Sequence, residues 1–475
     1  MSLKTQVRVG AVITAEARFF DLRRMEKDLR VWNKAVRTKV DLGRKLAKKD
    51  VEYVDLLEYR GDEISFPRGI QWREYLRPGT EVEVVREEFN PEPASLDFKR
   101  TLREVQQKAA DAAIAAGLEK DHLLCLGCGQ GKSSWGLWFA AQRGKKTLVV
   151  VDRDFIVDQW ANETATCFGE EEREKLGRVQ GQKWKVGPNI TVAMIHTLSQ
   201  NLDRLTPEWC GQFGTIIFDE VHVLSAPSFS KTISRFKGVR LGLSATPTRV
   251  DGMDPIFRSH LSATPVFTYT KSRYNAEWYF KRTPHLVPPQ EVERKMMTAS
   301  WVNGRQVMML NRPVYDTQAC ERGVFEEFIL RDIRRLVTSG RCALVLGTRT
   351  EILERMSNAC AAEGISSSFI IGRVKRKERE EGFQAQVIFA TASLASKALD
   401  IPRLDTLILL FPSADEGFIR QAKGRIDRDY EGKKAPIVVT YVHPVRSLEK
   451  KSEQMAAIAR TVDRGAKVAW VGGTK

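Results

Sequence analysis

The sequence predicts an α/β protein in which two tandem parallel-sheet domains follow a small N-terminal α+β domain. From Leu102 onward, helical stretches alternate with short apolar runs, which is typical of the strand–helix units of parallel sheets. The apolar runs form two series, one before and one after a stretch with little pattern. At 475 residues the chain also exceeds the usual size of a single hydrophobic core. We therefore expect domains at 1–95, 96–272 and 316–475, with 273–315 as a linker or insertion.

The N-terminal domain is predicted to be a basic accessory domain that binds DNA. A β-like run at 7–14 precedes a charged helical stretch from Asp21 to Lys49, and a short strand is expected at 51–57. Residues 1–50 carry 14 Lys and Arg against 6 Asp and Glu, whereas residues 51–100 are mildly acidic. The prolines of 90–93 indicate a linker. A solvated basic face is the alternative to a DNA-binding surface. The candidate backbone and stacking contacts are Arg23, Arg24, Lys27, Arg30, Trp32, Arg37 and Lys39.

The two α/β domains can be followed run by run. The first is expected to begin with a helix at 102–118, because this stretch is rich in alanine and other good helix formers. Its strands are predicted at 123–127, 146–152, 190–196, 215–220 and 239–244. The strands of the second domain are predicted at 342–348, 368–372, 386–391, 406–411 and 435–442. These runs are apolar almost throughout, which indicates strands that are buried on both faces.

Composition and charge narrow the possible functions. The chain has 42% hydrophobic and 29% charged residues, and no apolar run is long enough to span a membrane. The N-terminal sequence lacks the apolar core of a signal peptide, so we expect the cytoplasm of a bacterial or phage-infected host cell. The seven cysteines lack regular spacing and are expected to be reduced thiols. The formal net charge of +16 favours a polyanionic partner.

A glycine-rich stretch, Gly127 to Ser134, follows the first of these apolar runs. Glycines let a loop aim its backbone N–H groups at phosphate oxygens, and the N-terminus of the following helix adds a positive dipole end. Lys132 would then reach the β- and γ-phosphates, while Ser133 would offer its hydroxyl to a magnesium ion. The strict phosphate-loop spacing requires glycine where this chain has Leu126. An ordinary strand-to-helix turn is therefore the alternative.

A second apolar run, 215–218, ends in the adjacent carboxylates Asp219 and Glu220. Ligands of open α/β sheets bind at the carboxyl ends of the strands. In a nucleotide site Asp219 would hold magnesium, and Glu220 would orient or deprotonate the attacking water. The alternative is a strand that ends in a solvated acidic turn.

Two further patterns have structural rather than functional interpretations. Cys125 and Cys128 form a C-x-x-C pair, but without a second pair they are expected to fill a strand and a loop rather than bind zinc. Trp135, Trp138 and Phe139 are expected in a helix core rather than in a base-stacking platform.

From residue 98 to residue 440 the chain closely resembles the helicases and translocases of superfamily 2. The ordered motifs of that family correspond to residues 102–106 (entry motif), 129–133 (I), 149–160 (Ia), 194–198 (Ib), 219–222 (II, in its DExH form) and 244–247 (III) of the first domain. In the second domain they correspond to 344–349 (IV), 390–402 (V) and 421–428 (VI). Asp152 stands where the family usually has proline, and Lys397-Ala398 replaces the frequent Glu-Gly. The resemblance implies two RecA-like domains, ATP and Mg²⁺.

The resemblance also implies roles for individual residues. The nucleotide would be bound by Arg103, Gln106, Gly127, Gly129, Gln130, Gly131, Lys132, Ser133, Ser134 and Asp400, with Ser133 and Asp219 as magnesium ligands. The catalytic residues would be Lys132, Asp219, Glu220, Gln421, Arg425 and Arg428. His222, Ser244 and Thr246 would couple hydrolysis to movement, and Thr197, Thr348, Arg349 and Thr391 would contact nucleic acid.

Arg425 and Arg428 matter most for the chemistry that this resemblance implies. Guanidinium groups opposite the γ-phosphate stabilise the charge that develops in phosphoryl transfer and contribute a rate factor of about 10³ to 10⁵ in related hydrolases. Because both arginines lie in the second domain, hydrolysis is expected to require closure of the two domains.

Within the superfamily the chain is most similar to the XPB-like and phage UvsW-like group of branched-DNA helicases. The similarity lies in Phe66-Pro67-Arg68-Gly69, in the entry motif and in the run 244–257, although a tight turn is the alternative for the first of these. We therefore expect a DNA helicase or translocase that acts on forks and junctions in recombination, repair or replication restart. An RNA-dependent DExH ATPase, a non-catalytic nucleic-acid-binding motor fold and the motor subunit of a restriction system are the alternatives. The basic run Lys375, Arg376, Lys377 and Arg379 is either a phosphate contact or a solvated surface.

Overall fold

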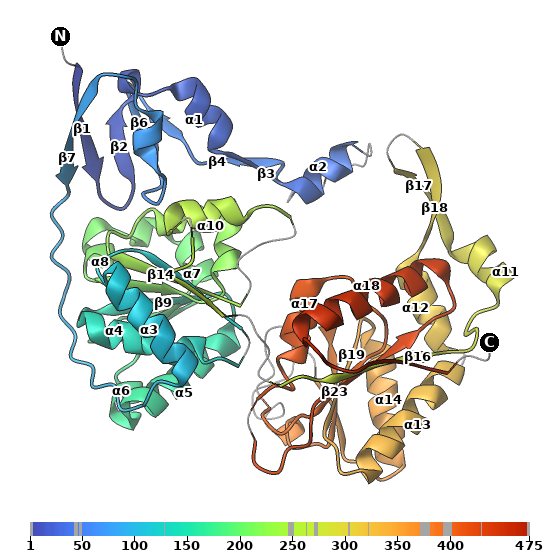
Figure 1. The fold of residues 1–475 in the computed structure, drawn as a ribbon. Coiled ribbons are helices and arrows are strands. Elements are labelled where there is room, and N and C mark those ends of the chain that lie inside the picture. Colours follow the sequence, from blue (N-terminus) through green and yellow to red (C-terminus); the bar gives the residue numbers. More distant parts are fainter. Residues whose placement is uncertain are drawn as a thin grey trace. The chain divides into compact units, whose positions relative to one another are not determined.

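The computed structural model consists of two compact units (Figure 1), formed by Met1–Leu126 with Gln130–Thr270 and by Lys271–Lys475 with Gly127–Gly129. It describes residues 3–41, 46, 50–127, 129–245, 251–262, 264–269, 274–302, 305–321, 323–370, 381–392, 401–428 and 430–472. No helix among these residues is long and apolar enough to cross a membrane. The predicted fold class, an N-terminal α+β domain followed by two parallel-sheet domains, is confirmed.

The N-terminal domain is built on a five-stranded sheet of order β5-β6-β2-β1-β7. Its strands are β1 (Leu3–Val9), β2 (Ile13–Glu16), β5 (Glu58–Arg60), β6 (Glu63–Phe66) and β7 (Thr80–Arg86), and the β1–β7 pair is parallel. The other elements are η1 (Ala17–Phe19), α1 (Leu22–Asp28), η2 (Trp72–Tyr75), and the ribbon β3 (Arg30–Trp32) with β4 (Tyr53–Asp55), next to α2 (Lys34–Asp41).

The single helical stretch predicted from Asp21 to Lys49 is wrong in one respect, because β3 interrupts it between α1 and α2. The physical reason is tertiary: β3 pairs with β4, and Val31 of β3 is buried in the domain core. Asn33 then starts α2, since its side-chain oxygen accepts a hydrogen bond from the Val36 amide at 3.1 Å.

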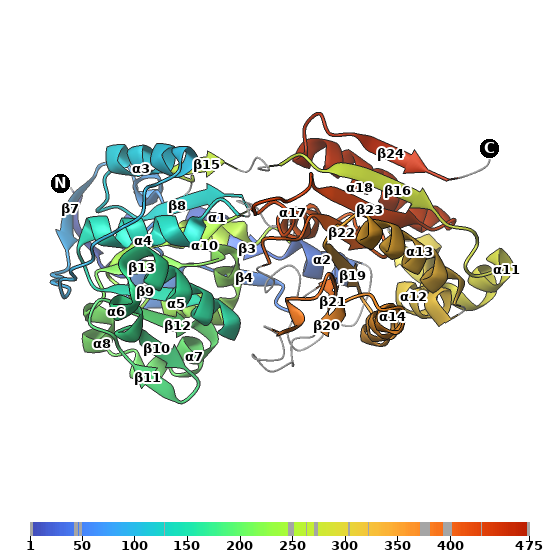
Figure 2. The same cartoon turned by 90° about the horizontal axis from the view of Figure 1, so that it is seen from below.

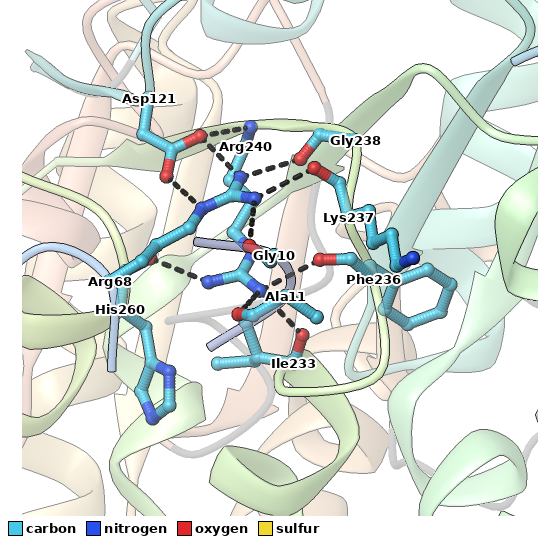
Figure 3. Close-up of polar contacts among 10 residues, drawn as sticks. All are labelled: Gly10, Ala11, Arg68, Asp121, Ile233, Phe236, Lys237, Gly238, Arg240 and His260. Carbon is cyan, nitrogen blue, oxygen red and sulfur yellow. Dashed lines mark hydrogen bonds and ion pairs between the residues drawn. The ribbon is translucent and has the colours of Figure 1, made fainter. Parts of the chain in front are cut away.

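The N-terminal domain is joined to the first α/β domain by both apolar and polar contacts. Met253 and Ile256 of the α/β domain belong to the same buried cluster as the core of the N-terminal sheet. Arg68 donates two hydrogen bonds of 2.6 Å to Asp121, and donates to the carbonyls of Lys237 and Gly238 at 2.7 and 2.6 Å (Figure 3). This salt bridge is largely buried, with 12% and 13% of the two side chains exposed.

Arg240 completes this interface from the side of the α/β domain. Its guanidinium is fully buried and donates to backbone carbonyls, among them that of Ala11 in the N-terminal domain (Figure 3). Gly69 fits closely against the α/β domain, because a Cβ there would lie 2.6 Å from the Ser259 carbonyl oxygen. The stretch 66–69 is therefore a docking element between two domains rather than an isolated turn.

The first α/β domain has an eight-stranded sheet of order β11-β10-β12-β9-β13-β14-β8-β15, in which every pair except β10–β11 is parallel. Its strands are β8 (His122–Leu126), β9 (Thr147–Val151), β10 (Gly177–Gln180), β11 (Lys183–Lys185), β12 (Ile190–Met194), β13 (Thr215–Phe218), β14 (Val239–Ser244) and β15 (Phe267–Tyr269). Its helices are α3 (Glu104–Ala116), α4 (Lys132–Arg143), α5 (Asp154–Phe168), α6 (Glu170–Glu174), α7 (Ile195–Gln200), η3 (Leu202–Arg204), α8 (Pro207–Gly211), η4 (Val221–Ser225), α9 (Pro227–Ile233) and α10 (Asp254–His260).

Helices cover both faces of this sheet (Figure 2), and alternate strand residues point to the two sides. In β8, Leu124 and Leu126 join one buried cluster, whereas Leu123 and Cys125 join the other. This arrangement explains why the central strands read as continuous apolar runs.

The second unit contains a parallel seven-stranded sheet of order β20-β21-β19-β22-β23-β16-β24. Its strands are β16 (Glu277–Arg282), β19 (Ala343–Gly347), β20 (Ser367–Ile370), β21 (Val387–Thr391), β22 (Thr406–Leu409), β23 (Ile437–Val442) and β24 (Val468–Val471). The remaining elements are α11 (Pro289–Glu291), η5 (Val292–Met296), the hairpin β17 (Met297–Val302) with β18 (Arg305–Leu310), α12 (Arg312–Glu321), α13 (Val324–Thr338), α14 (Thr350–Ala362), α17 (Glu416–Lys423) and α18 (Arg446–Val462).

The prediction of a linker or insertion at 273–315 needs correction, because β16 lies inside the second sheet between β23 and β24. Trp278 and Phe280 are fully buried, while Glu277, Tyr279 and Lys281 alternate with them along the strand. This alternation gave no continuous apolar run, and the strand was therefore missed from the sequence. The expected linker at 90–93 lies against the surface of the first α/β domain, because Pro93 forms a β-bridge with Lys145.

Candidate active site

The predicted motifs of the first α/β domain emerge from one edge of its sheet. Five consecutive strands of the sheet, in the order β12-β9-β13-β14-β8, are parallel to one another. Their carboxyl ends therefore lie at the same edge of the sheet. The glycine-rich loop follows β8, Asp219 follows β13, and Ser244 ends β14. This is the edge at which open α/β sheets bind ligands.

The glycine-rich loop has the backbone geometry that phosphate binding requires. Gly129 and Gly131 have φ values of 75° and 74°, in the left-handed region that glycine enters without steric cost. Helix α4 begins at Lys132, so the first N–H groups of a 12-residue helix lie at the end of the loop. The Lys132 ammonium donates to the carbonyl of Leu126, at the end of β8, over 3.3 Å. The structure thus places Lys132 beside the loop.

Two residues of the entry motif lie directly against this loop. Gln106 donates its side-chain amide to the Gly131 carbonyl at 2.9 Å and accepts the Arg103 backbone N–H at 2.9 Å. A Cβ on Gly131 would stand 2.4 Å from Gln106 Nε2 and 2.5 Å from Arg103 Nη2. Position 131 therefore favours glycine for its backbone angle, and a side chain there would displace the ends of the Gln106 and Arg103 side chains.

Asp219 is partly buried at the end of β13 and is held by two donors. Trp160 Nε1 donates to Asp219 Oδ2 at 2.9 Å, and the Glu220 backbone N–H donates to Oδ1 at 2.9 Å. Burial raises the pKa of the Asp219 carboxyl to about 6, and the neighbouring Glu220 charge acts in the same direction. The Trp160 hydrogen bond and the Lys132 charge oppose this shift of the pKa.

Glu220 has a strained backbone. Among the residues that the structure describes, it is the single non-glycine residue with a positive φ, at 48°. Such strain is concentrated at functional sites, where the surrounding structure enforces it. His222 lies two residues further on, with its Nδ1 3.4 Å from Glu220 Oε2. The structure therefore brings Glu220 and His222 together.

Asp219 offers a carboxylate and Ser133 offers a hydroxyl, and both groups are suitable ligands for Mg²⁺. In nucleotide sites Mg²⁺ usually takes one or two protein ligands together with phosphate oxygens. No cluster of three or more His, Cys, Asp or Glu suited to a metal ion occurs in the described part of the chain. The donor set fits magnesium that is bound mainly through a nucleotide.

Trp160 is a candidate functional residue that the sequence analysis did not single out. It lies on α5, is fully buried, and reaches Asp219 with its indole N–H. A buried tryptophan requires a hydrogen-bond acceptor, which was the available signal. Its partner, however, is 59 positions away and becomes known only from the fold.

Three other predictions in this domain concern buried groups. Gln130 is buried, and the Ser134 hydroxyl is buried 3.5 Å from Cys167 Sγ. Ser244 is fully buried at the end of β14, whereas Thr246 lies outside the described residues. The Thr197 hydroxyl, expected to contact nucleic acid, accepts the Gly181 backbone N–H at 2.9 Å. These nucleotide and nucleic-acid roles stay predictions.

The positions of the nearby aromatic and cysteine residues agree with the structural roles expected for them. Trp135, Trp138 and Phe139 are buried in the core beneath α4. Cys125 is buried in β8, and burial raises the pKa of its thiol to about 11. Cys128 lies outside the described residues.

In the second unit, Gln421 lies on α17, and Arg425 and Arg428 follow this helix directly. Lys423, between them in sequence, is 1% exposed and forms ion pairs with Asp427 at 2.6 Å and Asp463 at 2.8 Å. Trp278 Nε1 donates to the second oxygen of Asp463 at 2.7 Å. Lys423 thus links the end of α17 to Asp463, a buried contact that the motif pattern did not reveal.

The predicted nucleic-acid contacts of the second unit lie at one edge of its sheet. Thr391 ends β21, while Thr348 and Arg349 follow the neighbouring parallel strand β19. The Thr348 hydroxyl donates to Asp316 at 3.1 Å, and Arg349 donates to the Pro313 carbonyl at 2.9 Å. Asp400, the pair 397–398 and the basic run 375–379 lie outside the described residues.

Two parallel-sheet domains, the first with a glycine loop and a strand-end Asp-Glu pair at one edge, define a RecA-like nucleotide-hydrolysing motor. The family described as "Type III restriction enzyme, res subunit" matches residues 99–249, which is less than half of the chain. Yeast Dbp5 bound to RNA and ADP BeF3 has a similar structure, with a TM-score of 0.56 over 78% of this chain and 90% of Dbp5 at 11% identity. At this identity the likeness shows the fold alone.

Named helicases are similar in sequence. "Probable helicase D10" of Escherichia phage T5 is 28% identical over 66% of this chain and 66% of its own length. "Putative ATP-dependent RNA helicase L396" of Acanthamoeba polyphaga mimivirus is 26% identical over 76% of this chain and 67% of its own. "DNA 3'-5' helicase XPB" of Mycobacterium tuberculosis is 25% identical over 63% and 53%, so the match spans about half of that relative. Together with the fold, these similarities support a helicase of superfamily 2 with ATP-dependent helicase activity.

Proposed function

We propose that the chain is an ATP-dependent DNA helicase or translocase that acts on branched DNA, such as forks and junctions, in recombination, repair or replication restart. The observation that carries the proposal is the shared sheet edge, where the glycine loop, Asp219 and Glu220 meet. Similarity to a DNA helicase of the XPB group supports DNA as the substrate.

The site residues have defined roles in this proposal. The loop N–H groups and Lys132 bind the phosphates, and Ser133 and Asp219 hold the magnesium ion that neutralises them. Glu220 orients or deprotonates the attacking water, while Arg425 and Arg428 stabilise the charge that develops on the γ-phosphate. Asp400 binds the ribose, and the remaining motif residues link turnover to the nucleic acid.

The docked N-terminal domain agrees with a DNA substrate, because it contains the stretch that resembles branched-DNA helicases. The stretch 66–69, on which the resemblance to branched-DNA helicases partly rests, fixes the N-terminal domain to the first α/β domain through Arg68 and Asp121. The positive charge of this domain lies in residues 1–50. A basic surface held rigidly beside a motor can contact the duplex on which the motor acts.

The test measures ATP hydrolysis with single-stranded DNA, blunt duplex, forks, four-way junctions and single-stranded RNA at one fixed salt concentration. We expect the strongest stimulation by forks or junctions, and loss of turnover in Lys132→Ala and Glu220→Gln. Unchanged hydrolysis in both variants would refute the role assignments.

RNA is the second candidate substrate, because the mimiviral relative is named an RNA helicase. Stimulation by single-stranded RNA alone, without any response to forked DNA, would favour this alternative and overturn the proposed substrate.

A further inference from the structure

We propose that the ribbon β3–β4 and helix α2 of the N-terminal domain form a platform on which unpaired bases of a DNA strand stack. This inference rests on the proposed function only in taking DNA as the polymer. The residues that define the platform are Arg30, Trp32, Arg37 and Tyr53.

The register of the ribbon separates a buried face from an exposed face. Val31 pairs with Val54, and Val31 is buried in the domain core. Trp32 pairs with Tyr53, and because alternate residues of a strand point to opposite faces, both rings lie on the outer side. They are 37% and 39% exposed, which is unusual for two large aromatic side chains in contact with each other.

The exposed face is an aromatic pair flanked by two guanidinium groups. The ring centroids of Trp32 and Tyr53 are 5.2 Å apart, Arg30 lies 4.4 Å from the Tyr53 centroid, and Arg37 lies 4.9 Å from the Trp32 centroid. Asp55 fixes Arg30 with hydrogen bonds of 2.7 and 3.2 Å. Arg37 makes no ion pair with any described residue, so its charge is available to a phosphate.

Charge indicates which partner this surface suits. Residues 21–50 contain 11 Lys and Arg against 5 Asp and Glu, which favours a polyanion. Basic residues interleaved with exposed aromatic rings are typical of surfaces that track the backbone and stack the bases of single strands. A paired duplex hides its base faces, and therefore the aromatic pair favours an unpaired strand, as found at a fork or junction.

The platform is also held in place on the first α/β domain. The Lys34 amide, at the start of α2, donates to the Asp251 carbonyl at 3.0 Å, and Asp251 Oδ1 accepts the Met253 amide at 3.1 Å. The Met253 carbonyl in turn accepts the Ser225 hydroxyl at 2.8 Å. Ser225 ends η4, the helix that starts directly after Glu220. A strand on the platform would thus be held at a fixed place relative to the catalytic carboxylates.

The test uses the full chain and two labelled ligands, an oligothymidylate and a blunt duplex, at one salt concentration. Trp32→Ala should weaken oligothymidylate binding by roughly 5- to 150-fold, as expected for the loss of one stacked base, and duplex binding much less. Trp32→Phe should restore most of the affinity. The matched control is Trp470→Ala, which removes an equally exposed tryptophan (39%) from the second unit and should leave affinity unchanged.

Arg37→Gln provides a second variant in case Trp32→Ala does not fold, as judged by its thermal midpoint. It should reduce the salt dependence of oligothymidylate binding by about one unit of slope. Wild-type affinity in both variants, or equal losses for single strand and duplex, would overturn the platform. If the variants lose affinity but DNA never stimulates wild-type ATP hydrolysis, the proposed function fails and the platform stands. If DNA stimulates hydrolysis but the variants bind DNA like the wild type, the platform fails and the proposed function stands.

Discussion

Replacement of Arg68 by alanine tests whether the N-terminal domain is an integral part of the first unit. The substitution removes a bidentate salt bridge whose side chains are 12% and 13% exposed, and it also removes the donors to the Lys237 and Gly238 carbonyls. Loss of one partner of a buried pair leaves the other charge uncompensated and costs about 3–5 kcal/mol. For a unit of this size we expect the thermal midpoint to fall by about 10 °C.

The assay is thermal unfolding followed by calorimetry or circular dichroism. The matched control is Arg18→Ala, because Arg18 forms an ion pair with Glu16 at 2.8 Å but is 75% exposed. Such an exposed pair contributes about 1 kcal/mol at most. The double variant Arg68→Ala with Asp121→Ala should cost less than the sum of its parts, since it removes the unpaired carboxylate. Equal midpoints for Arg68→Ala and Arg18→Ala would refute the reasoning.

Three further predictions follow from single contacts. Gly131→Ala should weaken nucleotide binding more than Gly129→Ala. The new Cβ at position 131 would meet Gln106 and Arg103, whereas a Cβ at position 129 would meet nothing within 4 Å. Nucleotide titration of both variants checks this. Trp160→Phe should lower kcat about 10- to 100-fold, the worth of a hydrogen bond to a charged group, without loss of stability comparable to Trp160→Ala. Burial lowers the pKa of His260 to about 3, compared with about 6.5 in the unfolded chain. Between these two values the unfolded state binds more protons than the folded state. The free energy of unfolding should therefore decrease as the pH falls from about 6.5 towards 3. Urea unfolding between pH 7 and 5 should show a flatter pH dependence for His260→Gln; an unchanged slope would contradict a buried neutral imidazole.

The sequence was sufficient for the strands that are buried on both faces. β8, β13 and β14 appear as apolar runs because helices cover both sides of their sheet. β16 was missed because its buried Trp278 and Phe280 alternate with the polar residues Glu277, Tyr279 and Lys281. β3 was hidden inside a charged helical pattern, since only its pairing with β4 reveals it.

The same limit applies to the candidate site. Candidate residues that belong to a short contiguous motif, such as Gly131 and the pair Asp219-Glu220, could be singled out from the sequence. Trp160 and Lys423 could not, because each is defined by a partner distant in sequence. A motif records which groups face the ligand, whereas the groups that hold them are fixed by tertiary packing.

Lys423 shows how these missed elements belong together. A lysine that is 1% exposed is tolerable only with close carboxylates, and it has two, Asp427 and Asp463. Asp463 follows α18 and also accepts the indole N–H of Trp278, which lies on β16. The helix that carries Gln421 and leads to Arg425 is therefore anchored to the strand that the sequence had assigned to a linker. Without β16, Asp463 would lose the hydrogen bond from Trp278, and the ion pair of Asp463 with the buried Lys423 would be less well fixed. This contact gives a physical reason for the strand to lie within the second sheet.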